Sequence, residues 1–295
     1  MTRSGFVALA GRPNVGKSTF VNAVVGEKVA IVSEKPQTTR RAIRGVHERG
    51  DAQLVLVDLP GVQRPRDALT ARMARRVQQE LDGADAALLM INGEQGVGPG
   101  DRFIAGRLAV ASTPAVIAVN KADRLSHQAL LEALAHAGEL ELDAEVFPIS
   151  ARTGAGVQEL IAHLATMLPE GPFVFAAETA SDQPEELTLA ELIREAAIRR
   201  TFHEVPHAVE VVVEEIEPPG ERAGVTRVRA LIWVETNSQK GILIGSGGSM
   251  IKNIGIAARK EIEAALGGRV HLDLSVKVRR DWRADEGLLD RLGIS

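Results

Sequence analysis

The sequence predicts two folded units, an α/β unit with a mostly parallel sheet covered by helices on both faces, followed by a smaller α+β unit. Short apolar runs that alternate with helical stretches up to residue 167 predict the first unit. After the Pro- and Gly-rich stretch at 169–172 the pattern changes to a helix, two alternating strands and a glycine-rich segment. We therefore place the first domain at residues 1–173, a linker at 174–186 and the second domain at 187–295.

The elements of the first domain follow from the lengths and periods of its apolar runs. Strands are expected at 5–10, 53–57, 86–91, 115–119 and 146–149, and helices at 17–25, 69–82, 101–110, 126–137 and 156–167. Residues 42–48 are expected to add one strand antiparallel to its neighbour. Since open α/β sheets bind ligands at the carboxyl ends of their strands, the loops that follow these strands are the places to look for a site.

The second domain is expected to have the order α-β-β-α-α-β. A helix over 187–202 precedes strands over 209–216 and 225–234, with a turn at Pro218-Pro219-Gly220 between the strands. The glycine-rich segment, a helix that ends at Leu266 and a strand over 269–278 complete the pattern.

Composition favours an intracellular protein. The chain has no cysteine, which excludes a disulfide framework and a thiolate metal site. No apolar run approaches the roughly 18 residues that a membrane span needs, and the first strand begins too soon after Met1 for a signal peptide. We expect a cytoplasmic protein and a monomer.

The most informative motif is the G-x-x-x-x-G-K-S sequence that joins the first strand to the first helix. In this context backbone N–H groups surround an anion, and the helix N-terminus adds partial positive charge. Lys17 can reach the β- and γ-phosphates, and the Ser18 hydroxyl can coordinate Mg²⁺. The motif predicts a nucleoside triphosphate site whose phosphate-binding residues are Gly11, Asn14, Val15, Gly16, Lys17, Ser18 and Thr19.

The base is indicated by Asn120-Lys121-Ala122-Asp123, an N-K-x-D sequence after a buried strand. The Asp123 carboxylate can accept hydrogen bonds from N1 and N2 of guanine, whereas adenine would leave the carboxylate unpaired. Lys121 would lie along the purine ring, and a backbone N–H of Ser150-Ala151 would meet the guanine O6. We therefore expect GTP, with Asn120, Lys121, Asp123, Ser150 and Ala151 around the base.

A third motif, Asp58-Leu59-Pro60-Gly61, follows another buried strand. Asp58 would hold Mg²⁺ through its water shell, and the Gly61 N–H would meet the γ-phosphate. In the polar stretch Gln37-Thr38-Thr39-Arg40, one threonine hydroxyl would complete the magnesium shell when GTP is bound. We favour Thr39 over Thr38, which gives Ser18, Thr39 and Asp58 as the magnesium residues.

The glycine-rich segment of the second domain has the I-G-x-G-G-x-x-I form typical of a K-homology (KH) domain. Its G-x-x-G loop consists of Gly245, Ser246, Gly247 and Gly248, and it lacks the side-chain bulk that would keep a single-stranded nucleic acid away. Although the whole chain carries a net charge of −4, residues 238–283 hold nine basic and four acidic residues. Local charge governs affinity for phosphates, and we expect RNA contacts from the loop and from Lys252, Arg259, Arg279 and Arg280.

Together these motifs resemble the Era family of bacterial GTPases, and the resemblance covers essentially the whole chain. It rests on G-R-P-N-V-G-K-S, Q-T-T-R, D-L-P-G and N-K-A-D, joined to a C-terminal type-II KH domain. It implies GTP hydrolysis, binding to single-stranded RNA near the 3′ end of 16S ribosomal RNA, and a role in maturing the 30S subunit. Peripheral association with the inner membrane is a further family trait. Related KH loops often carry lysines where this chain has Ser246 and Ser249.

The residue that follows D-L-P-G is Val62. Ras-like enzymes place a water-orienting glutamine directly after D-x-x-G, but this chain has Val62 there. By resemblance, Asn14 would help to hold a K⁺ ion that supplies positive charge; alternatively, Asn14 only stabilises its loop. Gln63 lies one position too late. We expect the residues that act at the γ-phosphate to be Lys17, Asn14, Thr39 and Gly61.

Two other functions are compatible with these motifs. The protein could be a signalling or membrane-linked regulator whose contact with RNA is incidental. Alternatively, it could be an RNA-binding module whose first domain holds GTP without hydrolysing it.

Overall fold

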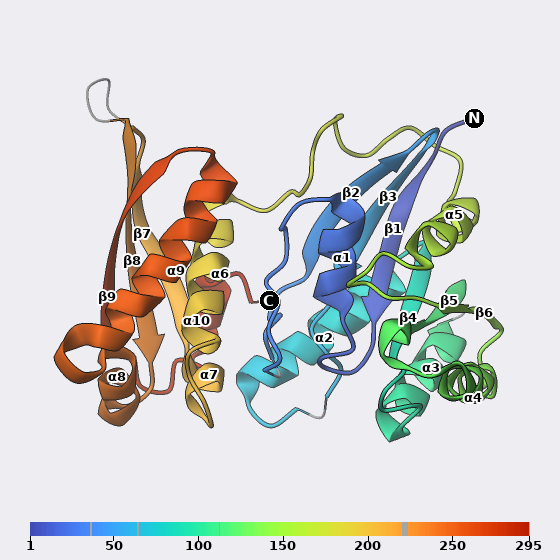
Figure 1. The fold of residues 1–295 in the computed structure, drawn as a ribbon, viewed down its shortest axis with the longest axis horizontal. Helices are drawn as coiled ribbons and strands as arrows, with labels where there is room; N and C mark the ends of the chain where they lie inside the picture. Colours follow the sequence, from blue (N-terminus) through green and yellow to red (C-terminus); the bar gives the residue numbers. More distant parts are fainter. Residues whose placement is uncertain (36, 64, 112, 220–223, 295) are drawn as a thin grey trace.

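The computed structural model describes residues 1–35, 37–63, 65–111, 113–219 and 224–294. The molecule has two parts that lie side by side, and each is built around its own sheet (Figure 1). The larger sheet has six strands in the order β2-β3-β1-β4-β5-β6. Their bounds are β1 (Arg3–Ala10), β2 (Ile43–Arg49), β3 (Ala52–Asp58), β4 (Ala86–Asn92), β5 (Ala115–Asn120) and β6 (Ala144–Pro148). Only β2 pairs antiparallel, along β3, which confirms the α/β prediction and the expected antiparallel strand among the described residues.

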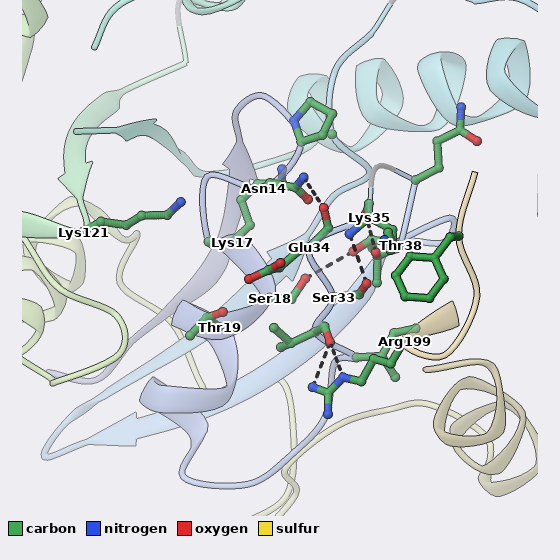
Figure 2. A pocket seen from close by; sticks show the side chains of 18 of the residues that line it. Asn14, Lys17, Ser18, Thr19, Ser33, Glu34, Lys35, Thr38, Lys121 and Arg199 are labelled. Carbon is green, nitrogen blue, oxygen red and sulfur yellow. Dashed lines mark hydrogen bonds between the residues drawn. The ribbon is translucent and has the colours of Figure 1, made fainter. Parts of the chain in front are cut away.

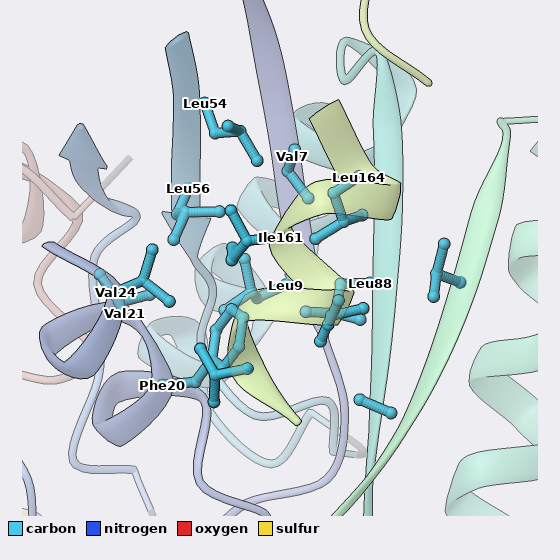
Figure 3. Close-up of a cluster of buried hydrophobic side chains, with 14 of the residues drawn as sticks. Val7, Leu9, Phe20, Val21, Val24, Leu54, Leu56, Leu88, Ile161 and Leu164 are labelled. Atoms are coloured by element: carbon cyan, nitrogen blue, oxygen red, sulfur yellow. The ribbon is translucent and has the colours of Figure 1, made fainter. Parts of the chain in front are cut away.

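Helices cover both faces of this sheet because its strands are apolar on both sides. One core packs α1 (Lys17–Val25) and α5 (Val157–Met167) against side chains such as Val7 and Leu9 of β1 (Figure 3). The opposite core takes the alternate residues, Ala8 and Ala10, together with three helices. These are α2 (Ala68–Asp82), α3 (Pro99–Ala111) and α4 (His127–Gly138), which follows the short 3₁₀ helix η1 (Ala122–Arg124). Period-two alternation therefore divides one strand between two cores.

The second unit has a three-stranded sheet in the order β7-β8-β9. Its elements are α6 (Glu185–Ile198), α7 (Val205–Ala208), β7 (Glu210–Glu217), β8 (Val225–Val234), α8 (Asn237–Ile244), η2 (Ser246–Gly248), α9 (Ser249–Leu266), β9 (Arg269–Val278) and α10 (Glu286–Arg291). β8 pairs antiparallel with β7 and parallel with β9, and α6 and α9 share one core with the sheet. The order agrees with the α-β-β-α-α-β prediction. The turn expected at Pro218-Pro219-Gly220 ends at a residue outside the described ranges.

The segment expected to be a linker runs beside the edge strand β2 before it enters α6 (Figure 1). The Val46 N–H donates to the Ala180 carbonyl at 2.9 Å, and Gly45 and Ser181 form an antiparallel bridge. Upstream, Gln53 binds the backbone of Val174 and Phe175. The connection is therefore fixed to the first sheet, although it carries little regular secondary structure.

The chain ends between the two units (Figure 1). Trp282, Leu288, Leu289 and Ile294 form a buried apolar cluster with Leu69 and Met73 of α2. Trp282 is fully buried, and its indole N–H donates to the Ala208 carbonyl at 3.0 Å. The C-terminal segment thus packs the second unit against the helix that follows the Asp58 motif.

Candidate functional site

The carboxyl ends of β1, β3 and β5 meet at a cavity of about 830 Å³. The phosphate-loop residues Asn14, Lys17 and Ser18 lie on one side of it, and the segment that contains Thr38 and Thr39 lies on the other (Figure 2). Lys121 borders the cavity from the β5 side. Three of the motifs found in the sequence therefore share one cavity.

The phosphate loop bends into α1 at Gly16, which has φ 105°. A Cβ atom at this position would lie 2.3 Å from Asn120 Nδ2, so a side chain is excluded by backbone conformation and by space. Asn120 Nδ2 donates to the Val15 carbonyl at 2.8 Å, and Asn120 Oδ1 accepts from the Ala151 N–H at 2.9 Å. Asn120 therefore joins the phosphate loop to the loop after β6.

A backbone N–H of Ser150-Ala151 is expected to meet guanine O6, and both of these N–H groups have partners within the protein. The Ser150 N–H donates to the Ala155 carbonyl at 2.9 Å, and the Ala151 N–H donates to Asn120 Oδ1 at 2.9 Å. The contact with guanine O6 stays a prediction. Sequence spacing identifies which loops converge, but it does not show which donors one loop uses to hold another.

Lys17 is buried at the start of α1, and its Nζ donates to the carbonyls of Gly11 and Arg12 at 3.2 Å each. Burial lowers the pKa of Lys17 from 10.5 to about 8, although the negative charge of Asp58 opposes this shift. The ammonium thus lies inside the phosphate loop, where an anion would restore the charge stabilisation that burial removes.

Two hydroxyls and a carboxylate come together beside Lys17. Ser18 Oγ donates to Asp58 Oδ2 at 2.5 Å, and Thr39 Oγ1 lies 3.2 Å from Ser18 Oγ and 3.4 Å from Asp58 Oδ2. Asp58 is fully buried, its Oδ1 has no hydrogen-bond partner among the residues that the structure describes, and burial raises the pKa of its carboxyl. Thr38 points elsewhere, because its hydroxyl donates to the Lys35 carbonyl at 2.6 Å. The structure thus groups the three residues expected at magnesium and separates Thr38 from them.

Gly61 approaches the phosphate loop closely, since a Cβ on Gly61 would lie 2.7 Å from the Pro13 nitrogen. Val62 packs against an apolar core, and its N–H donates to the Gly11 carbonyl at 3.2 Å. Gln63 lines a different cavity, between α2 and α3. These positions agree with the interpretation that neither Val62 nor Gln63 orients water.

Asn14 has a positive φ of 64°, and its Nδ2 donates to the Glu34 carbonyl at 2.7 Å. This bond connects the phosphate loop with the segment that carries Thr39 (Figure 2). It is the loop-stabilising contact that the sequence left as one of two possibilities. It also places the Asn14 amide beside a backbone carbonyl.

The Asp123 carboxylate accepts from Ser150 Oγ at 2.7 Å and from Arg152 Nη2 at 3.0 Å. The Ser150 bond, and then the attraction of Arg152, lower the pKa of Asp123 and keep it ionised. Lys121 has φ 66°, and its Nζ lies 3.5 Å from Glu94 Oε2. Sequence reasoning missed Arg152 because its link to Asp123 depends on how two loops meet.

The KH-type loop lies between α8 and α9. Ser246 and Gly247 are exposed, whereas a Cβ on Gly245 (φ 73°) would lie 2.8 Å from the Met250 nitrogen. Gly247 and Gly248 have open space around the positions of their missing Cβ atoms. The loop can therefore approach a ligand backbone without side-chain obstruction.

The four basic residues expected at RNA are all exposed: Lys252, Arg259, Arg279 and Arg280. Lys252 and Arg259 belong to α9, and Arg279 and Arg280 follow β9. Arg259 also lines a groove with Arg200 and Lys260, which were not among the expected contacts. No helix in the described ranges is both long and apolar enough to cross a membrane.

Comparison with known families matches both halves of the chain. The 50S ribosome-binding GTPase family matches residues 6–121, and the KH domain family matches residues 204–283. The chain is 46% identical to GTPase Era of Mycobacterium avium over 294 residues, which cover 99% of this chain and 98% of the relative. This chain belongs to the Era family of GTPases. GTPase Era of Mycobacterium tuberculosis H37Rv is 45% identical, with 98% of each chain covered.

Solved Era structures have the same fold over the full length. The structure of Era in complex with MgGDPNP and nucleotides 1506–1542 of 16S ribosomal RNA matches with a TM-score of 0.95, at 35% identity and with 100% of both chains covered. Era of Aquifex aeolicus bound to GDP and AlF₄⁻ matches with a TM-score of 0.94, at 36% identity and with 100% of both chains covered. The agreement includes the α/β domain and the KH domain.

Proposed function

We propose that this Era-family GTPase is a switch that binds single-stranded 16S ribosomal RNA near its 3′ end and assists maturation of the 30S subunit. The observation that carries the proposal is that one chain has a cavity lined by the phosphate loop, Thr39, Gly61 and Lys121 and also has a G-x-x-G loop between α8 and α9. The Era structure that matches this fold with a TM-score of 0.95 is a complex with MgGDPNP and nucleotides 1506–1542 of 16S ribosomal RNA. The protein would act in the cytoplasm, as a monomer, with peripheral association at the inner membrane as a further possibility to test.

In the cavity, the phosphate-loop N–H groups and Lys17 would hold the β- and γ-phosphates. Asp123 would select guanine, with Ser150 and Asn120 fixing the loops around it. The proposal includes the domain bounds, with the GTPase domain at residues 1–173, the linker at 174–186 and the KH domain at 187–295. GTP would bind in the first domain and RNA in the second, and the two domains remain in contact with each other.

Ser18, Thr39 and Asp58 fit a magnesium ion. Hydroxyl and carboxylate oxygens are suitable ligands for Mg²⁺, and the buried Asp58 Oδ1 has no partner in the described residues. When bound, the ion would offset the negative charge that develops during phosphoryl transfer. Thr39 would take part when GTP is present, which would place its segment in a GTP-specific position.

We also propose K⁺ as an activator of hydrolysis. Val62 cannot orient water, and phosphoryl transfer needs positive charge near the β–γ bridge, to which a K⁺ ion would add beside Lys17 and Mg²⁺. Asn14 Nδ2 donates to the Glu34 carbonyl at 2.7 Å, and the Asn14 side-chain oxygen would be the ligand for K⁺. The Gly61 N–H would meet the γ-phosphate from the opposite side.

Crosslinking to ribosomal RNA in the presence of a non-hydrolysable GTP analogue tests the proposed partner. We expect crosslinks near the 3′ end of 16S RNA and, without crosslinking, retention of the protein on 30S particles after a salt wash. Crosslinks scattered over unrelated RNAs, or loss of the uncrosslinked protein in that wash, would favour a regulator whose RNA contact is incidental. Release of phosphate from GTP, abolished by Lys17→Ala, would separate a GTPase from a protein that only holds GTP.

A further inference from the structure

The segment that carries Thr39 is held largely by the KH domain. We call residues 31–35 and 37–41 the switch segment. Ile31 packs into the KH core, the Val32 N–H donates to Glu195 Oε1 at 3.0 Å, and the Val32 carbonyl accepts from Arg199. Arg199 and Phe202 also line the nucleotide cavity (Figure 2). The segment that directly follows the first KH helix, α6, is therefore part of the wall of the site.

The contact nearest to Thr39 comes from Arg194 of α6. Arg194 is 1% exposed, and its Nη2 donates to the Thr38 carbonyl. The same guanidinium binds Glu191, with Nε 3.1 Å from Oε1 and Nη2 2.5 Å from Oε2. One planar group thus joins a buried carboxylate of α6 to the peptide that precedes Thr39.

The residues that follow Thr39 are fixed by the same domain. Arg40 is fully buried and donates to the Val209 carbonyl at 2.7 Å and to the His207 carbonyl at 2.8 Å. Arg41 donates to Glu191 Oε1 at 2.8 Å. The KH domain therefore contacts the peptide on both sides of Thr39, and these contacts favour the position of the Thr39 hydroxyl beside Ser18 and Asp58.

We propose that Arg194 is a positioning residue for GTP hydrolysis. By holding the Thr38 carbonyl, it directs the Thr39 hydroxyl toward Ser18 and Asp58. The KH domain thereby contributes to the GTP-specific arrangement of the catalytic domain of the same chain. This inference rests on the proposed role of Thr39 at magnesium.

The test compares the affinities for GDP and for a non-hydrolysable GTP analogue, both with Mg²⁺. Arg194→Met removes the bond to Thr38, and Arg194→Lys keeps the charge beside Glu191 but loses the fork that binds both partners. Each variant should bind the analogue about tenfold more weakly, the effect of one charge-assisted hydrogen bond, while GDP affinity stays within about twofold. The kcat should fall together with the analogue affinity. Thr39→Ala should give the same selectivity change, and adding Arg194→Lys to it should produce little further loss.

Arg72→Met is the matched control. Arg72 is a nearly buried arginine at the same domain junction, and it binds Glu286, Asp290 and the Ile294 carbonyl without contacting the switch segment. Its loss should reduce stability and leave the ratio of the two affinities unchanged. If the Arg194 variants lower both affinities equally, as a general loosening would, the positioning role is wrong. If Arg194→Met does not fold, Arg194→Lys decides the question. Failure of the wild-type protein to bind GTP would instead refute the proposed function.

Discussion

Glu210→Gln is the most informative perturbation of the junction between the two domains. Glu210 is 1% exposed, and its two carboxylate oxygens accept from Arg40 at 2.6 Å and from Arg41 at 3.1 Å. Neutralising it removes the negative charge that the two buried guanidinium groups share, although Arg41 keeps its contact with Glu191. Removing one member of a buried ion pair typically costs about 3–5 kcal/mol, and we expect a loss of unfolding free energy of this size at pH 7.

The pH dependence of the Glu210 ion pairs gives a second value for their contribution to the free energy of unfolding. Burial alone would raise the pKa of Glu210, but the attraction of Arg41 and Arg40 outweighs it and lowers the pKa from 4.5 to about 2. Because folding lowers its pKa, ionised Glu210 stabilises the folded protein in full above the unfolded-state pKa of 4.5 and progressively less as the pH falls toward 2. Its full contribution to the free energy of unfolding is about 3 kcal/mol, of which about 2 kcal/mol is lost by pH 3.

The assay is urea unfolding followed by tryptophan fluorescence at pH 7 and pH 3. Both tryptophans, Trp233 and Trp282, lie in or beside the C-terminal cluster, so their emission reports the KH domain and the junction. The difference in free energy of unfolding between the wild-type protein and Glu210→Gln should be about 2 kcal/mol smaller at pH 3 than at pH 7. Glu215→Gln, on an exposed glutamate of β7 that pairs with Arg229, should change stability by less than about 0.5 kcal/mol. A Glu210→Gln variant within about 1 kcal/mol of wild type at pH 7 would refute the reasoning.

Three further predictions concern the proposed ligands. Asp123→Asn should weaken GTP binding and shift preference toward xanthosine triphosphate, because an amide donor suits the xanthine carbonyl; titration with both nucleotides checks this, and unchanged GTP preference would exclude the guanine assignment. Phosphate release should be faster in K⁺ than in Na⁺, and Asn14→Ala should reduce that difference; equal rates in both salts for the wild-type protein would contradict the K⁺ proposal. Gly247→Asp with Gly248→Asp should abolish RNA binding measured by filter retention while GTP affinity stays within about twofold, since the added carboxylates repel phosphates. Both positions have room for a Cβ, but their φ angles are +57° and +79°, so folding of the variant is checked first. RNA binding with native affinity and salt dependence in that folded variant would remove the loop from the interface.

The sequence predicted the elements and the meeting of the phosphate and base motifs. Apolar runs of strand length specify a parallel sheet, and such a sheet brings the loops after β1, β3 and β5 to one edge. The sequence alone does not determine which of Thr38 and Thr39 points toward Asp58, because side chains in an irregular loop do not alternate in direction as they do in a strand. The backbone turns so that Thr38 Oγ1 reaches Lys35 and Thr39 Oγ1 reaches Asp58.

The contacts between the domains could not be predicted from periodicity. From the sequence, Arg40 in a loop and Arg194 in a helix would be expected at the surface, yet both are buried at the junction between the domains. Arg40 binds Val209 and Glu210, which lie 169 and 170 residues away in the chain, and Arg194 binds the Thr38 carbonyl, 156 residues away. The C-terminal segment is similar, since α10 is too short to show an apolar face until Leu288 and Leu289 meet α2.

A path of packed elements connects the two proposed binding surfaces. The switch segment rests on α6, α6 shares a core with α9, and α9 begins directly after Gly248. If GTP binding changes the affinity for RNA, RNA binding must change the affinity for GTP by the same factor. We infer from this path that GTP binding and RNA binding are coupled in this chain.

The coupling of GTP binding to RNA binding is best measured with a labelled RNA. The RNA spans nucleotides 1506–1542 of 16S ribosomal RNA, the segment present in the Era complex. The RNA is titrated with protein loaded with Mg²⁺ and a non-hydrolysable GTP analogue, and separately with protein loaded with GDP. Coupling of the usual size predicts binding about tenfold tighter with the GTP analogue, and weak binding of a scrambled RNA in both states. Equal affinity in the two nucleotide states, or no preference over the scrambled RNA, would contradict the account.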